Sequence, residues 1–187
     1  MEETYFHDET FERITTLAIG EYENCTFNNC NFENLNLSGI KFTDCIFNGS
    51  NLSLAKLSKT AFREVKFKDC KMLGLRFDTC SEFGLSFSFE TCQLNHSSFY
   101  KTKIKNTIFK NTLLFETDFA ECDLTGAKFE NCDLAGASFD GTKLEKVNFL
   151  TAFNYTINPE TNQIKKAKFS SSGLEGLLRK YDIIVEG

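Results

Sequence analysis

The chain has 187 residues, with 26 acidic and 21 basic side chains and a formal net charge of −5. This length suits one domain. No apolar run approaches the ~20 residues that cross a bilayer, so a membrane-spanning protein is excluded and no membrane partner is expected. The N-terminus carries Glu2 and Glu3 where a secretory signal would carry Lys or Arg. We therefore expect a cytoplasmic protein.

Residues 1–21 come before any regular spacing of apolar side chains. Seven acids occur by residue 23, whereas Arg13 is the one basic residue: Glu2, Glu3, Asp8, Glu9, Glu12, Glu21 and Glu23. An exposed strand edge at the end of a β structure would pair with other chains. We interpret residues 1–21 as a charged N-terminal cap.

Large apolar residues then recur at every fifth position. The first run contains Tyr22, Phe27, Phe32, Leu37, Phe42, Phe47, Leu52, Leu57, Phe62, Phe67, Met72 and Phe77. The second run contains Phe89, Leu94, Phe99, Ile104, Phe109, Leu114, Phe119, Leu124, Phe129, Leu134, Phe139, Leu144 and Phe149. Neither strand alternation nor a helical stripe produces this spacing, so an internal repeat organises the chain.

A second, smaller inward position lies two residues before each of these central residues. Residues two apart in an extended segment point to the same side. The remaining three positions of each unit are mostly polar residues that suit turns and solvent. All eight Cys occupy the smaller position: Cys25, Cys30, Cys45, Cys70, Cys80, Cys92, Cys122 and Cys132. We expect buried free thiols rather than zinc ligands or disulfides.

The register of the repeat slips between the two runs. Phe77 and Phe89 are twelve residues apart, which is two units plus two residues. The segment 78–88 must absorb this shift at a corner or as a bulge. Glu82 falls on a central position of the first run, and burying an unpaired carboxylate is costly. We expect its side chain to turn outward.

Units such as Cys122-Asp123-Leu124-Thr125-Gly126 resemble pentapeptide repeats, over roughly residues 20–153. The resemblance implies an all-β fold, a right-handed quadrilateral parallel β-helix with four units per coil and ~4.8 Å between coils. This β-helix is expected over residues 22–153. In the second run Phe alternates with Leu or Ile, so opposite faces of a four-sided coil would share a residue type.

The C-terminal segment, residues 154–187, changes character at Pro159, the single Pro of the chain. A strand is expected at Lys165–Phe169, followed by an N-cap among Ser170–Ser172. A short α-helix is then expected from four apolar residues at helical spacing: Leu174, Leu177, Leu178 and Tyr181. So short a helix is marginal alone. It must dock, either as a lid on the last coil or on a second subunit. The tail Ile183–Val185 reads as a strand or an apolar strap.

The tail resembles that of the topoisomerase-interacting pentapeptide repeat proteins, the Qnr, MfpA and McbG types. The resemblance rests on the Asn158-Pro159-Glu160 turn, the Lys165–Phe169 strand and the Gly173–Leu178 helix. In that group the C-terminal element joins two chains into a rod that imitates duplex DNA and engages DNA gyrase or topoisomerase IV. The resemblance implies a homodimer through Leu174, Leu177, Leu178 and Tyr181. The long loops of Gram-negative Qnr proteins are missing here, which favours topoisomerase contact in general over quinolone protection in particular.

Charge is distributed unevenly along the repeats. Residues 25–77 hold eight basic and four acidic side chains, whereas residues 113–150 hold eight acids and three Lys. In a tail-to-tail rod the acids would flank the centre and could meet a DNA-binding groove. We therefore expect a topoisomerase-facing acidic surface made of Glu116, Asp118, Glu121, Asp123, Glu130, Asp133, Asp140 and Glu145.

The sequence offers no catalytic constellation. His7 and His96 are the two histidines, and no phosphate loop or paired-His motif appears. We expect a protein that is not an enzyme and uses no metal or cofactor. The leading hypothesis is a DNA-mimicking homodimer that binds gyrase or topoisomerase IV, without binding nucleic acid directly, and modulates the enzyme or protects it from quinolone-type poisons. The alternative is a structural or partner-binding scaffold unrelated to topoisomerases, since a fold alone fixes no function.

Overall fold

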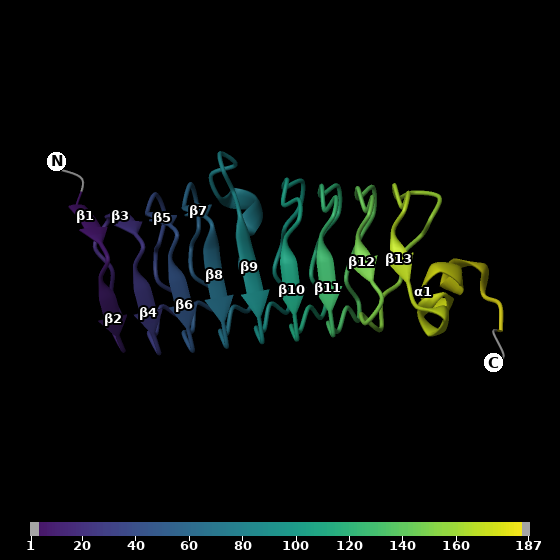
Figure 1. Ribbon diagram of the computed structural model, residues 1–187, viewed down its shortest axis with the longest axis horizontal. Coiled ribbons are helices and arrows are strands. Elements are labelled where there is room, and N and C mark those ends of the chain that lie inside the picture. The colour runs from purple at the N-terminus through teal and green to yellow at the C-terminus, as the bar shows by residue number, and fades with distance from the viewer. Residues whose placement is uncertain (1–3, 185–187) are drawn as a thin grey trace.

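The computed structural model, which describes residues 4–184, is a rod of stacked coils with the two chain ends at opposite ends of the stack (Figure 1). The strands are β1 (Thr4–His7), β2 (Thr10–Glu12), β3 (Gly20–Glu23), β4 (Thr26–Asn28), β5 (Lys41–Thr43), β6 (Ile46–Asn48), β7 (Ala61–Arg63), β8 (Val65–Lys68), β9 (Phe87–Glu90), β10 (Ile108–Lys110), β11 (Lys128–Glu130), β12 (Asn148–Phe149) and β13 (Lys168–Phe169). The helices are the 3-10 turns η1 (Phe77–Thr79), η2 (Ser171–Gly173) and η3 (Arg179–Tyr181) and the α-helix α1 (Glu175–Leu178).

The strands form two parallel sheets, one of nine strands from β2 to β13 and one of four strands, β1-β3-β5-β7. Most paired residues are twenty apart in sequence, as in Phe109 with Phe129. Twenty residues are four five-residue units. The predicted four-sided parallel β-helix is therefore confirmed, with one short C-terminal helix.

Four faces run along the rod, and each is named here by its central inward residues. The first face contains Tyr22, Phe42 and Phe62, then Ile104, Leu124 and Leu144. The second face, the nine-stranded sheet, contains Phe11, Phe27, Phe47, Phe67, Phe89, Phe109, Phe129, Phe149 and Phe169. The third face contains Phe32, Leu52, Met72, Leu94, Leu114 and Leu134, and the fourth contains Leu37, Leu57, Phe77, Phe99, Phe119 and Phe139.

The nine Phe rings of the second face form one continuous stack through the core. Successive ring centroids lie between 4.5 and 5.3 Å apart. Before the register shift these rings meet the first face edge-on, as in Phe27 with Phe42 at 5.8 Å. After it they meet the fourth, opposite face edge-on, as in Phe109 with Phe119 at 5.9 Å. The expected sharing of residue types by opposite faces is thus present in the second run.

The register shift is a single coil of 22 residues. Val65 pairs with Phe87 and Phe67 pairs with Phe89. A turn around Phe83 and Gly84 carries the two extra residues and stands out from the coil in Figure 1. The side chain of Glu82 is exposed there, as predicted.

Strand pairing continues past both expected boundaries of the repeat. At the N-terminus β1 and β2 pair with β3 and β4, with a sequence offset of 16 residues. This offset is not a multiple of five, so counting back from Tyr22 in steps of five does not identify the inward residues of β1 and β2. At the C-terminus β13 pairs with β12. Ile164 and Phe169 resume the five-residue spacing after Asn154 and Pro159 interrupt it.

Removing one ring from the stack should leave a cavity that the rigid coils cannot close. We expect Phe129→Ala to lower the free energy of unfolding by about 3 to 5 kcal/mol, measured by urea denaturation. Phe83→Ala, which truncates a ring that is 80% exposed, is the control and should change the free energy by less than about 1 kcal/mol. Equal effects of the two substitutions would contradict the stacked core.

Candidate interaction surfaces

The eight Cys side chains are free and buried, as predicted. Each lies in the smaller inward position, and a typical thiol contacts a backbone carbonyl, as in Cys132 Sγ to Phe109 O at 3.4 Å. Burial raises the pKa of Cys45, Cys122 and Cys132 to about 12. A thiol with so high a pKa is protonated at neutral pH, and the thiol is a weaker nucleophile than the thiolate. Among residues 4–184, no group of three or more His, Cys, Asp or Glu could hold a metal ion.

The raised thiol pKa values make stability fall at alkaline pH. The unfolded chain loses its thiol protons first, so this contribution is complete below about pH 9 and is lost as the pH rises toward 12. Each thiol adds a slope of up to about 1.4 kcal/mol per pH unit. We expect the variant Cys122→Ala/Cys132→Ala, unfolded in urea with a non-thiol reductant between about pH 8 and 10, to lose stability less steeply than the parent protein. Parallel curves would contradict this reading.

The two histidines lie in different coils and each contacts a carboxylate. His7 Nε2 lies 3.0 Å from Asp8 Oδ2, and His96 Nδ1 lies 3.1 Å from Glu116 Oε2. The His96 ring also meets Phe115 edge-on at 5.5 Å. All of these groups are exposed.

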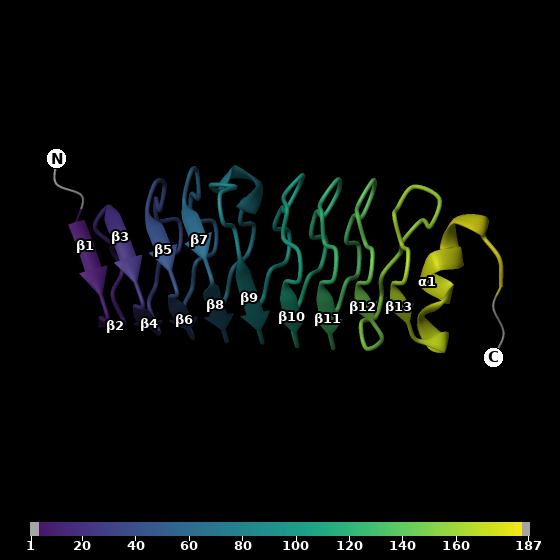
Figure 2. The same cartoon turned by 45° about the horizontal axis from the view of Figure 1, so that its top comes forward.

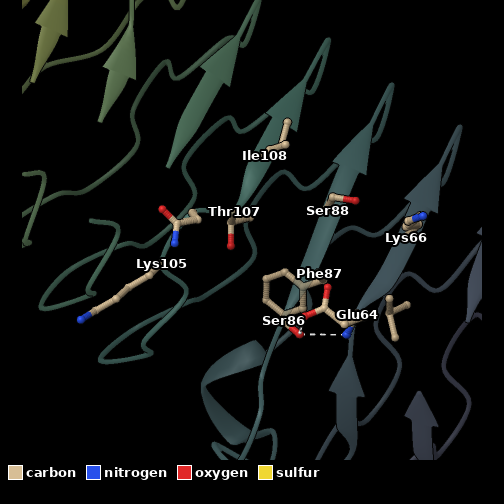
Figure 3. Close-up of a pocket in the computed structure, with 10 residues that line it drawn as sticks. Glu64, Lys66, Ser86, Phe87, Ser88, Lys105, Thr107 and Ile108 are labelled. Atoms are coloured by element: carbon tan, nitrogen blue, oxygen red, sulfur yellow. Dashed lines mark hydrogen bonds between the residues drawn. The ribbon is translucent and has the colours of Figure 1, made fainter. Parts of the chain in front are cut away.

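An open groove of about 380 Å³ lies where the 22-residue coil distorts the first and second faces (Figure 3). The Glu64 backbone N–H donates to Ser86 Oγ at 2.8 Å within it. Lys105 points away from this pair in Figure 3, and its Nζ lies 3.4 Å from Asp123 Oδ2.

The eight acids of the expected topoisomerase-facing surface do not share one face. Asp123 and Glu145 lie on the first face and Glu130 on the second, because each is next to a central residue of that face. The other five lie on the third and fourth faces or at their corners: Glu116, Asp118, Glu121, Asp133 and Asp140. The sequence shows how many acids are present but not how the coils distribute them.

Over residues 92–154 this distribution divides the rod lengthwise. The acidic side, which is the third and fourth faces with their corners, has the five acids just named and Lys101, a net charge of −4. The basic side, which is the first and second faces, has three acids and six Lys: Lys103, Lys105, Lys110, Lys128, Lys143 and Lys146. The last coil adds Lys165, Lys166 and Lys168 to the basic side.

Three acids of the acidic side lack a cation within 4.0 Å among the described residues: Asp118, Asp133 and Asp140. Asp118 accepts from the Ala120 N–H at 2.9 Å, and Asp133 accepts from Asn154 Nδ2 at 2.8 Å. By contrast, Glu121 lies 3.4 Å from Lys101 Nζ. With His counted as neutral, the net charge of this side therefore comes from these three aspartates and Glu116, whose neighbour is His96.

The C-terminal helical segment covers the end of the coil stack (Figure 2). Its N-cap is Ser170, whose Oγ accepts from the Gly173 N–H at 3.1 Å. Gly176 is buried against Tyr155, and its carbonyl accepts from the Ile157 N–H at 3.0 Å. The segment is thus docked on its own last coil through backbone contacts that only a small residue permits.

The four predicted interface residues divide between this lid and the surface. Leu177 packs against the core and Leu178 is half-buried. Leu174 is 47% exposed and Tyr181 is 50% exposed. The residues Ile183 and Ile184 are exposed and belong to no strand, and Val185 lies outside the described residues. We call Leu174, Tyr181, Ile183 and Ile184 the end patch.

The lid depends on Gly176. A Cβ at this position would lie 2.5 Å from Tyr155 O and 2.7 Å from Tyr155 Cδ2. We expect Gly176→Ala to cost about 1 to 3 kcal/mol and to expose the Arg179–Lys180 bond to trypsin while the coils remain folded. The control Glu175→Ala changes an exposed position on the same helix and should have little effect. Equal trypsin resistance in both variants would contradict the docking.

Comparison with known proteins identifies the family. The sequence matches the pentapeptide repeat region over residues 21–87 and 84–152. The chain belongs to the pentapeptide repeat family. Within residues 4–184, none of the helices has the length and apolar character needed to traverse a bilayer. No curated protein matches the sequence.

Solved pentapeptide repeat structures share the fold at low identity. A trypsin-treated variant of QnrB1, a plasmid-mediated fluoroquinolone resistance protein, matches with a TM-score of 0.60 and 16% identity, covering 99% of this chain and 100% of the other. Full-length QnrB1 matches with a TM-score of 0.46 and 17% identity, over 96% and 100% of the two chains. HetL, involved in heterocyst differentiation regulation in the cyanobacterium Nostoc sp. strain PCC 7120, gives 0.46 and 12%, over 89% and 85%.

Proposed function

We propose that this protein is a non-catalytic, DNA-mimicking homodimer that binds a type II DNA topoisomerase, DNA gyrase or topoisomerase IV. The end patch is the observation that carries the proposal. Its four apolar side chains are exposed on the C-terminal segment at one end of the rod, and Ile184 is 88% exposed. A second copy meeting the first through this patch would cover them and extend the rod.

The dimensions of such a dimer suit a mimic of duplex DNA. Nine strands in one sheet define eight spacings of ~4.8 Å, so one coil stack is about 38 Å long. Two stacks joined tail to tail span about 77 Å before their lids are counted, or roughly 23 base pairs at 3.4 Å each. The acidic side supplies negative charge over residues 92–154 of each protomer, the coils nearest the centre of such a dimer, where a cationic DNA-binding groove could meet it.

The QnrB1 likeness supports an antibiotic-related role, because that structure belongs to a fluoroquinolone resistance protein and overlaps this chain from end to end. The turn around Phe83 is the one outward turn of the repeat in the described residues, and it is short. We therefore propose modulation of topoisomerase activity as the general function, and protection from quinolones as one particular case of it. We place this activity in the cytoplasm, where thiols stay reduced.

A partner-binding scaffold unrelated to topoisomerases is the second candidate. The basic side is the observation that favours it, because nine Lys along two faces of the last coils do not resemble the surface of DNA. A scaffold of this kind is not expected to change DNA supercoiling by gyrase.

The test combines an activity and an oligomeric state. We expect the purified protein to inhibit gyrase supercoiling of relaxed plasmid, or to restore it in the presence of a fluoroquinolone. We expect Leu174→Asp/Ile184→Asp to halve the mass measured by light scattering, because charges at the end patch oppose its burial, and to weaken the gyrase effect at least about ten-fold. The control Leu54→Asp/Ile19→Asp places the same charges on exposed apolar positions far from the tip. A parent protein inactive on gyrase and topoisomerase IV would leave the scaffold as the function.

A further inference from the structure

The acidic side also carries exposed apolar side chains away from the end patch. Leu113 is 44% exposed, Phe115 is 41% exposed and Phe153 is 48% exposed. All three lie on the third face. Leu113, Asp133 and Phe153 follow one another in a single bridged column. Phe115 lies on the other side of the buried Leu114 in the same five-residue unit and is also exposed. We call these three residues the third-face patch.

The patch extends over three successive coils, about 10 Å along the rod. Asp133 sits in its centre without a cation, held by the Ala135 N–H and Asn154 Nδ2. Glu116 and Asp118 border it toward the fourth face. An apolar surface with carboxylates at its centre and rim matches a surface of opposite charge that itself carries apolar side chains.

The charges decide which occupant fits. Nucleic acid would be repelled by the five acids of this side. A second copy presenting its own third-face patch would set Asp133 near Asp133, a like-charge contact that opposes pairing. A polypeptide surface that combines Arg or Lys with apolar side chains satisfies both the aspartates and the apolar groups.

We propose that the rod meets its topoisomerase through the acidic side only, with the third-face patch as the apolar anchor on a basic, partly apolar surface of the enzyme. This inference rests on the proposed function. In this arrangement the basic side faces away from the enzyme. Its lysines would oppose binding if the enzyme contacted the rod on all sides, and they do not oppose it when only the acidic side is in contact.

The chain offers a matched control for the patch. Ile108 and Leu150 are apolar residues on the second face, 39% and 46% exposed, and they lie in the same coils as Leu113 and Phe153. We expect Leu113→Lys/Phe153→Lys to weaken binding to purified gyrase at least about ten-fold in biolayer interferometry, because the variant loses the anchor and adds repulsion. Ile108→Lys/Leu150→Lys should change the affinity less than about two-fold, with thermal midpoints of both variants compared first.

A second pair of variants tests the charges without altering apolar packing. Asp118→Asn/Asp140→Asn removes two unpaired carboxylates from the acidic side, and Glu130→Gln/Glu145→Gln removes two from the basic side. We expect the first pair to weaken gyrase binding about five-fold and to flatten its salt dependence, and the second pair to leave binding unchanged or tighter. This comparison stands even where the lysine variants fold poorly.

The outcomes separate the two proposals. Absence of parent binding to gyrase and topoisomerase IV overturns the proposed function and this inference with it. Parent binding that all four variants weaken equally, or that the basic-side variants weaken more, overturns the assignment of the contact side alone. Light scattering that shows assemblies larger than a dimer without enzyme, abolished by Leu113→Lys/Phe153→Lys, would assign the patch to contacts between copies and also overturn it.

Discussion

The arrangement of the surface side chains on this rod depends on the ladder of backbone hydrogen bonds that joins each coil to the next. Glu116 N–H donates to Ala135 O and Glu121 N–H donates to Asp140 O, each bond linking neighbouring coils at a corner. These corner residues have positive φ angles of +50° and +56°, a conformation that costs about 1 to 2 kcal/mol for a residue with a side chain. The hydrogen bonds between coils offset this conformational cost at each such corner. Charged side chains can therefore occupy corners where glycine would be easier.

The same ladder keeps outward side chains in straight columns. Lys103, Asp123 and Lys143 alternate in sign along one column, whereas Ser98, Asp118 and Ser138 form another with a single charge. Neighbours in a column are twenty residues apart in sequence. Residues only ten apart, such as Asp118 and Lys128, therefore lie on opposite sides of the rod. Charge polarity is therefore a property of the coil period, and a local count of acids does not reveal it.

This explains which parts of the structure could be predicted. The inward residues obey a five-residue rule that needs only the sequence, so the fold, the free thiols and the outward turn at Glu82 followed from it. The acidic surface did not, because a count of acids along residues 113–150 mixes four faces that only the position within the 20-residue coil separates. The partial coil of β1 and β2 was missed because its offset of 16 residues breaks the rule. The exposure of Leu174 and burial of Leu177 depend on how Gly176 meets Tyr155, a packing detail that helical spacing alone does not specify.

The lid links the two interaction surfaces through symmetry. A tail-to-tail dimer has a two-fold axis perpendicular to the rod. If that axis points outward through the acidic side, the rotation leaves both acidic sides facing the same way, and the rod presents the two together to its partner. A quarter turn of each protomer about the rod axis instead puts the two acidic sides on opposite sides of the rod. The rotation is set by how the end patches meet, and the end patch is held by the docking of Gly176 on Tyr155. A contact at the tip of each protomer thus determines whether two third-face patches can engage one enzyme surface together.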